Sequence, residues 1–117
     1  MKIYIATPVN ARKEATLEEK RKAAYERIKK LERLLCETEE EAEFHSSFDD
    51  DIAPLDVELT RNMYGYELPS EAVIMGRCVQ RVMECDMIIL DKGWIESNGC
   101  NIEASVALIY KKKIKKV

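Results

Sequence analysis

Residues 86–91 read Asp-Met-Ile-Ile-Leu-Asp, an unbroken apolar run with a carboxylate at each end. A run of this length without polar alternation is typical of a strand that is buried on both faces of its sheet. Such strands belong to parallel sheets that carry helices on both sides. The segment therefore indicates a parallel sheet covered by helices, and the neighbouring segments should supply the other strands and the helices.

Strands and helices alternate along the rest of the chain. We expect strands at residues 2–6, 41–45 and 113–117, and helices at residues 13–36, 70–84 and 100–110. In the first strand Ile3 and Ile5 share one face and Tyr4 takes the other. The alternation predicts an α/β fold, a flavodoxin- or Rossmann-like arrangement of three layers with a small parallel sheet and helices on both faces.

Two helices show apolar residues at helical spacing, which predicts their buried sides. In the first helix these are Leu17, Ala24, Ile28, Leu31 and Leu35. In the last helix they are Ile102, Val106, Ile109 and Tyr110. Glu103 then lies beside the expected buried stripe.

Residues 46–69 form a long irregular stretch with one expected helical turn near residues 56–62. Loops of this length within a compact domain are usually functional or disordered. The run Asp49–Asp51 is interpreted as a solvated loop, because the spacing of a calcium-binding loop is missing. His45 is interpreted as a polar residue at the end of a strand, with general acid or base chemistry as the alternative.

Composition favours a single cytoplasmic domain. The chain has 117 residues, a net charge of −3 and no apolar run of membrane-spanning length. Its four cysteines include no C-x-x-C pair and its only histidine is His45, so we expect reduced thiols and neither a metal nor another cofactor. The lysines of residues 111–116 are interpreted as flanks of an edge strand, since no aromatic residues interleave with them as in a nucleic-acid site.

The loops at residues 6–12 and 91–99 leave strands at the carboxyl edge of the sheet, where such folds bind ligands. The first loop offers Thr7, Asn10 and Arg12 to an anion. The second contains Ser97-Asn98-Gly99, which opens a helix whose free N–H groups also favour an anion. Ordinary helix capping explains the serine and asparagine equally well.

Glu103 follows one turn later, where a carboxylate can act as a nucleophile or base, or simply interact with the helix dipole. The common nucleotide-binding, zinc-protease and esterase motifs are missing from the sequence.

Three segments together carry a family resemblance. Residues 1–8 (Met-Lys-Ile-Tyr-Ile-Ala-Thr-Pro), residues 85–94 (Cys-Asp-Met-Ile-Ile-Leu-Asp-Lys-Gly-Trp) and residues 97–103 (Ser-Asn-Gly-Cys-Asn-Ile-Glu) resemble the nucleoside 2-deoxyribosyltransferase-like superfamily. This superfamily includes 2′-deoxynucleoside 5′-monophosphate N-glycosidases and many small uncharacterised proteins. The resemblance implies that residues 1–117 form one domain of this kind. Residues 46–69 match nothing in that pattern.

The resemblance also implies roles for residues. Glu103 stands where family enzymes carry the nucleophile that attacks C1′ of the deoxyribose. Ser97 stands where the nucleoside transferases have an aspartate and the monophosphate glycosidases a serine that meets the 5′-phosphate, and a hydroxyl does not repel phosphate as a carboxylate does. Further phosphate and sugar contacts would fall on Thr7, Asn10 and Arg12, beside Asn98 and Gly99.

Two residues depart from the family pattern. Cys78 stands where the family has an aspartate that helps to protonate the leaving base, and a thiol replaces a carboxylic acid poorly in that task. Thr7 replaces a glycine that is common after the first strand.

The resemblance thus implies N-glycosidic cleavage or transfer on a (deoxy)nucleoside 5′-monophosphate-like substrate. Tyr64, Tyr66 and Trp94 are the candidates for stacking on the base. The resemblance further implies a homodimer or higher homo-oligomer, with a small nucleotide as ligand and neither a nucleic-acid polymer nor a membrane as partner. The alternatives are a module of the same fold that binds a nucleotide without cleaving it, and an interaction protein without a small ligand.

Overall fold

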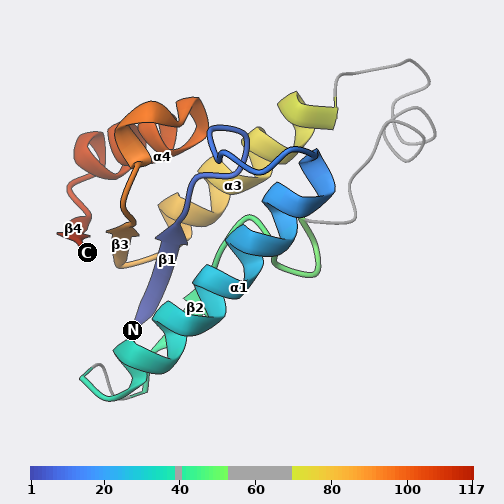
Figure 1. Ribbon diagram of the computed structural model, residues 1–117. Helices are drawn as coiled ribbons and strands as arrows, with labels where there is room; N and C mark the ends of the chain where they lie inside the picture. Colours follow the sequence, from blue (N-terminus) through green and yellow to red (C-terminus); the bar gives the residue numbers. More distant parts are fainter. Residues whose placement is uncertain (39–40, 53–69) are drawn as a thin grey trace.

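The computed structural model describes residues 1–38, 41–52 and 70–117 (Figure 1). In chain order the elements are β1 (Lys2–Ala6), α1 (Leu17–Cys36), β2 (Glu43–His45), α3 (Ser70–Glu84), β3 (Met87–Leu90), the 3-10 turn η1 (Trp94–Glu96), α4 (Asn98–Ile109) and β4 (Lys113–Lys116). The α/β class predicted from the sequence is confirmed. Within the described ranges, no helix has the length and apolarity needed to cross a membrane.

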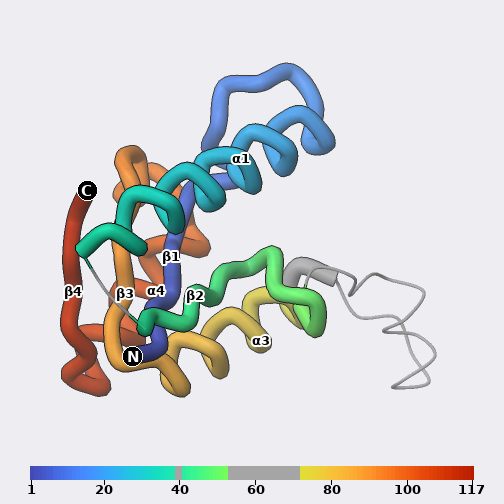
Figure 2. The backbone as a smooth tube through the Cα atoms, turned by 90° about the horizontal axis from the view of Figure 1, so that it is seen from below, coloured from blue at the N-terminus to red at the C-terminus, as the bar shows by residue number. Residues whose placement is uncertain are grey.

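The four strands form one parallel sheet in the order β2-β1-β3-β4. β1 and β3 are its central pair, and Ile3 of β1 lies opposite Met87 of β3. Figure 2 shows the strands from below, with α1 on one side of the sheet and α3 on the other. The order matches the start of a flavodoxin-like sheet, in which the chain turns in opposite directions after β1 and after β3. The elements are therefore compatible with the flavodoxin- or Rossmann-like fold expected from the sequence.

Each face of the sheet has its own apolar core. The face toward α1 contains Ile3, Ile5, Met87 and Ile89, packed with Ile28, Leu31 and Leu35 of the helix. The face toward α3 and α4 contains Tyr4, Ala6, Ile88 and Leu90, packed with Val82, Cys78, Cys100 and Ala107. The opposed placement of Ile3 and Tyr4, expected from alternation in the first strand, is confirmed.

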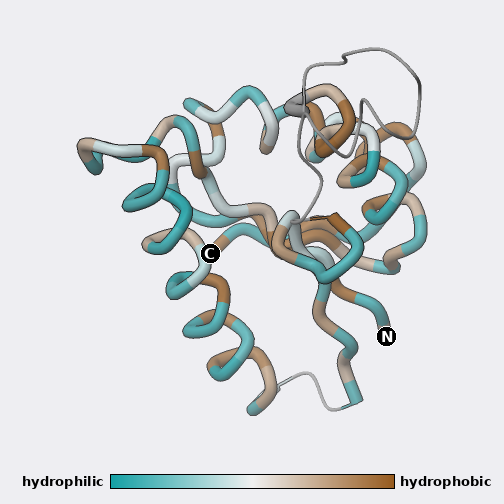
Figure 3. Tube along the Cα trace, turned by 90° about the vertical axis from the view of Figure 1, so that its right-hand side faces the viewer, coloured by the Kyte–Doolittle hydropathy of each residue, from teal (hydrophilic) through white to brown (hydrophobic). Residues whose placement is uncertain are grey.

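Helix α1 is amphipathic but shorter than the predicted helix of residues 13–36. It begins at Leu17 because Thr16 is extended and its side chain accepts a hydrogen bond from the N–H of Glu19 at 3.1 Å, which caps the helix. Hydrophobic and hydrophilic residues alternate around its turns (Figure 3). Leu17 was expected on the buried side but is exposed at the first turn, and burial starts at Ala24.

Helix α4 differs from its predicted packing. The expected buried stripe was wrong for Ile102, Ile109 and Tyr110, which are exposed, whereas Val106 is partly buried against the core. The buried residues are instead Cys100, Glu103 and Ala107. Two of these side chains are small, so the helix lies close to the sheet and carries the carboxylate of Glu103 inward with them. The orientation of α4 about its own axis therefore places a carboxylate on the buried side of the helix.

The sequence suggested that the acidic run Asp49–Asp51 after β2 is a solvated loop, but two of its carboxylates form ion pairs. Arg81 of α3 pairs with Asp49 at 2.9 Å and also with Asp51. His45 contacts Asp49 through Nδ1 at 2.8 Å. These contacts fix residues 46–52 against α3.

A partly buried ion pair joins α1 to the end of β3. Asp91 accepts hydrogen bonds from Nε and Nη2 of Arg27 at 2.8–3.1 Å, and its side chain is only 3% exposed. Thr7 donates its hydroxyl to the same carboxylate at 3.4 Å, and the N–H of Lys92 donates at 2.8 Å.

We expect Asp91→Asn to lower the free energy of unfolding by about 2 kcal/mol, because Arg27 loses a charged partner in a partly buried place. Urea denaturation at neutral pH measures the change. Asp50→Asn, which alters an exposed carboxylate, is the matched control and should leave the midpoint unchanged. Equal midpoints for all three proteins would contradict the role given to the Arg27–Asp91 pair.

Candidate functional site

The site lies where the chain diverges after the two central strands. Ala6 ends β1 opposite Leu90 of β3, and the N–H of Asp91 donates to the carbonyl of Ala6 at 3.1 Å. From there one segment leads to α1 on one face and the other leads to α4 on the opposite face. Such a divergence leaves a crevice at the carboxyl edge of a parallel sheet.

A cavity of about 630 Å³ occupies this crevice. Its walls come from the loop after β1, the start of α1, residues 47–48, α3, η1 and α4. The lining residues are Thr7, Val9, Asn10, Ala11, Leu17, Arg21, Ser47, Phe48, Ile74, Met75, Cys78, Glu96, Ser97, Asn98, Gly99, Cys100, Ile102 and Glu103. The cavity thus joins side chains from both faces of the sheet in one space.

The N-terminus of α4 opens into this cavity. Ser97 is the N-cap, and its Oγ accepts a hydrogen bond from the N–H of Cys100 at 3.3 Å. Its hydroxyl proton is left to donate to a ligand. Asn101 holds the preceding turn, because its Nδ2 donates to the carbonyls of Trp94, Ile95 and Ser97 at 2.7–3.3 Å.

Glu103 is a buried carboxylate in the cavity wall. Only 5% of the surface of this residue is accessible to solvent. Burial raises its pKa to about 7, and a hydrogen bond from the hydroxyl of Tyr4 opposes that rise. At neutral pH the side chain is therefore divided between an acid and a carboxylate, which suits a group that donates protons, accepts them or attacks carbon.

Cys78 lies next to the same two residues. Burial, followed by the negative charge of Glu103, raises its pKa to about 12, while a hydrogen bond with Tyr4 lowers it. The thiol is consequently neutral at physiological pH and neither attacks as a thiolate nor binds metal in that form. Cys100, which also lines the cavity, has a pKa raised to about 12, again mainly by burial.

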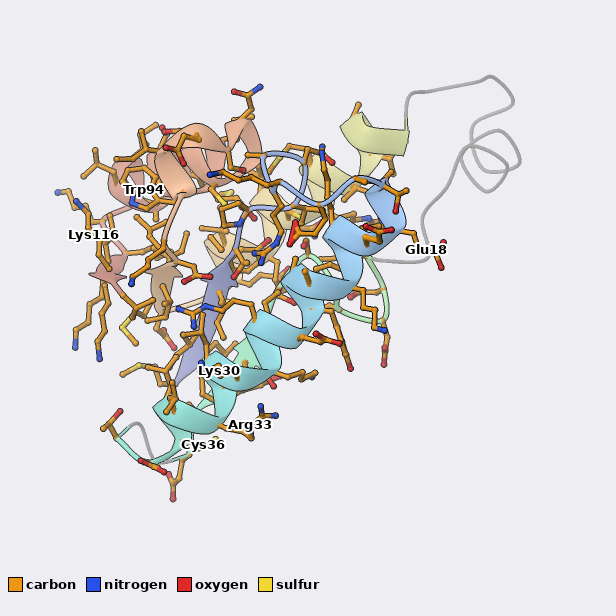
Figure 4. The ribbon with its side chains drawn as sticks, viewed as in Figure 1. Glu18, Lys30, Arg33, Cys36, Trp94 and Lys116 are labelled. Carbon is orange, nitrogen blue, oxygen red and sulfur yellow. The ribbon has the colours of Figure 1, made fainter. Side chains whose placement is uncertain are left out.

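The cavity brings together six of the residues singled out in the sequence: Thr7, Asn10, Ser97, Asn98, Gly99 and Glu103. Arg12 does not line it and instead pairs with Glu14 at 3.4 Å. Trp94 does not line it either, and Lys116 lies 5.6 Å from the centre of its ring (Figure 4). Tyr64 and Tyr66 fall outside the described residues.

Arg21 and Phe48 also line the cavity and were not predicted from the sequence. Arg21 belongs to the polar side of an amphipathic helix, where a solvated charge is the ordinary expectation. Phe48 sits in the irregular stretch after β2, which no periodicity places. The only sequence signal was an aromatic residue within an otherwise acidic segment.

The fold and cavity define a small α/β domain with a ligand crevice at the carboxyl edge of its sheet. Comparison with protein families matches residues 58–116 to the family described as a domain of unknown function, DUF4406. The match covers half of the chain, and the protein belongs to this family. Searches of curated proteins and of solved structures find no match to the chain.

Burial of Glu103 predicts a dependence of stability on pH. Its pKa is about 7 in the folded protein against 4.5 for an exposed glutamate, so the unfolded chain releases this proton at lower pH. The contribution to stability is fully present below pH 4.5 and is lost as the pH rises to 7, by about 3 kcal/mol in total. Glu103→Gln should therefore stabilise the protein at pH 8 relative to the wild type, and much less at pH 4.5.

Urea denaturation of both proteins at the two pH values tests this expectation. Glu26→Gln, which changes an exposed glutamate of α1, is the control and should follow the wild type at both pH values. A Glu103→Gln protein with the same pH dependence as the wild type would show that this carboxylate titrates normally.

Proposed function

We propose that the protein cleaves the N-glycosidic bond of a deoxynucleoside 5′-monophosphate, with Glu103 as nucleophile. The observation that carries the proposal is the burial of this carboxylate in a cavity that also receives the N-terminus of α4. A buried carboxylate costs stability, so its position in the wall of a cavity favours a chemical role. The resemblance of three sequence segments to nucleoside 2-deoxyribosyltransferase-like proteins supports the same reaction.

The phosphate end of the substrate is assigned to the start of α4. The free N–H groups there carry partial positive charge, which attracts an anion. The hydroxyl of Ser97 already accepts from the helix, so it can donate its own proton to a phosphate oxygen. Asn10, which lines the same cavity, adds an amide donor. The start of α4 and Asn10 therefore offer neutral donors to the phosphate.

The chemical step uses the ionised form of Glu103. One carboxylate oxygen forms a bond to C1′ while the bond between C1′ and the base nitrogen breaks, and the base leaves with the electron pair and takes up a proton. Water then hydrolyses the glycosyl ester, which releases the sugar phosphate and restores the carboxylate. The nearby hydroxyl of Tyr4 favours the ionised form of Glu103, because it lowers the pKa of this carboxyl group.

One observation favours a second candidate function, which is binding of the same nucleotide without cleavage. Cys78 lies beside Glu103, and with a pKa of about 12 it is a weak proton donor. A cavity with a nucleophile but no strong acid would hold a nucleotide and release its base slowly. The two functions share one ligand and differ in turnover.

Incubation with deoxynucleoside monophosphates, followed by chromatography of the free base, tests cleavage. We expect base release by the wild type and a loss of about 10³-fold or more in Glu103→Gln, because the nucleophile is removed. Glu26→Gln should retain the wild-type rate. Nucleotide-dependent thermal stabilisation without any base release would support the binding function instead.

The role of position 78 has its own test. Cys78→Asp supplies a carboxylic acid next to Glu103, and we expect base release to rise about tenfold or more because general acid catalysis is restored. Cys78→Ser, similar in size but no stronger as an acid, is the matched control and should not gain activity. No gain in a folded Cys78→Asp protein would show that protonation of the base does not limit the reaction.

A further inference from the structure

The wall of the cavity opposite α4 carries a guanidinium group and an aromatic ring, from Arg21 and Phe48. Phe48 packs against the core on the α1 face of the sheet, whereas Cys78 and Cys100 belong to the core on the α3 and α4 face. Arg21 of α1 and Phe48 both line the cavity. A ligand anchored at the start of α4 and attacked by Glu103 would extend its other end toward this wall.

Arg21 and Phe48 contact each other. The guanidinium carbon of Arg21 lies 5.6 Å from the centre of the Phe48 ring. That ring is held in turn by Tyr25, in an edge-to-face arrangement with 5.8 Å between the ring centres. Residues 46–52, which carry Phe48, are tied to α3 through Arg81. The wall is thus supported from two helices.

Within the described part of the chain, Arg21 has no carboxylate partner, in contrast to Arg27 and Arg81, which both do. Its side chain is half-buried, and a guanidinium carries only hydrogen-bond donors, arranged in a planar fork. Such a fork next to an aromatic ring suits a flat ligand group with two acceptors on one edge. A phosphate would use the charge of Arg21 but would make no use of Phe48.

We propose that Arg21 and Phe48 form a subsite for the base and select a 6-oxopurine, guanine or hypoxanthine. The ring oxygen O6 and nitrogen N7 of these bases are adjacent acceptors that match two donors of the fork. Adenine places an amino donor where O6 would be, so it opposes one of the guanidinium donors. Because the guanidinium lies over the Phe48 ring, a base paired with its edge lies in the same plane and contacts the rim of that ring. This inference rests on the proposed function, since it assumes a nucleotide with its phosphate at α4.

Binding measured without turnover tests the subsite. Isothermal titration of Glu103→Gln with dGMP, dIMP and dAMP should give dissociation constants about tenfold or more lower for the first two. Arg21→Lys, made in the same background, keeps the charge but loses the fork, so the preference should fall to about twofold or less while dAMP binding stays unchanged. Arg33→Lys is the matched control, because Arg33 lies near the other end of α1 and is exposed (Figure 4), and it should retain the preference.

Equal affinities for the three nucleotides would overturn the proposal, and so would a preference that survives Arg21→Lys. A uniform loss of affinity in Arg21→Lys would also overturn it, because it would assign the guanidinium to the phosphate. The preference together with a wild-type protein that releases no base would retain the subsite and reject cleavage. Failure of all three nucleotides to bind would reject both.

Discussion

The buried carboxylate of Asp91 is the interaction on which the rest of the site depends. It accepts hydrogen bonds from Arg27 of α1, from Thr7 of the loop after β1 and from the N–H of Lys92 in its own turn. A carboxylate that is 3% exposed has to find such partners, since an unpaired buried charge is costly. Helix α1, the loop after β1 and the turn after β3 are therefore held together at one point, and the two walls of the cavity begin from it.

The central part of the fold could be predicted from the local sequence pattern. Residues 3–6 of β1 and all residues of β3 are buried, and in the sequence both segments are apolar runs. The orientation of α4 could not be predicted in this way. Its largest apolar side chains, Ile102 and Ile109, are exposed, while Cys100 and Ala107 are buried. A sequence pattern assigns the largest apolar side chains to the buried side of a helix. This helix instead contacts the sheet through small residues, and tertiary packing decides which side of the helix is buried.

The residues of the candidate site likewise fall into two groups, those that could be predicted from the sequence and those that could not. Thr7, Asn10 and the segment from Ser97 to Gly99 could be predicted because they lie in the connections that follow two strands whose ends must meet at one edge. Arg21 and Phe48 reach the cavity only through long-range packing of α1 and residues 46–52, which no short motif encodes. Arg12 has the right position in the sequence, but the loop turns its side chain to Glu14.

The thiol of Cys78 affects the balance of the proposed reaction, since the nucleoside 2-deoxyribosyltransferase-like proteins that the sequence resembles carry an aspartate there. A second carboxylate beside Glu103 would repel its negative charge and raise its pKa further, whereas the neutral thiol leaves the nucleophile able to ionise near pH 7. The thiol is also a weak proton donor for the departing base of the proposed reaction. Hydrogen bonds from a guanidinium to O6 and N7 would stabilise the negative charge that develops on that base as the bond to C1′ breaks. In such a site Arg21 would compensate for the missing acid, and the reaction would favour those bases whose edge can accept from it.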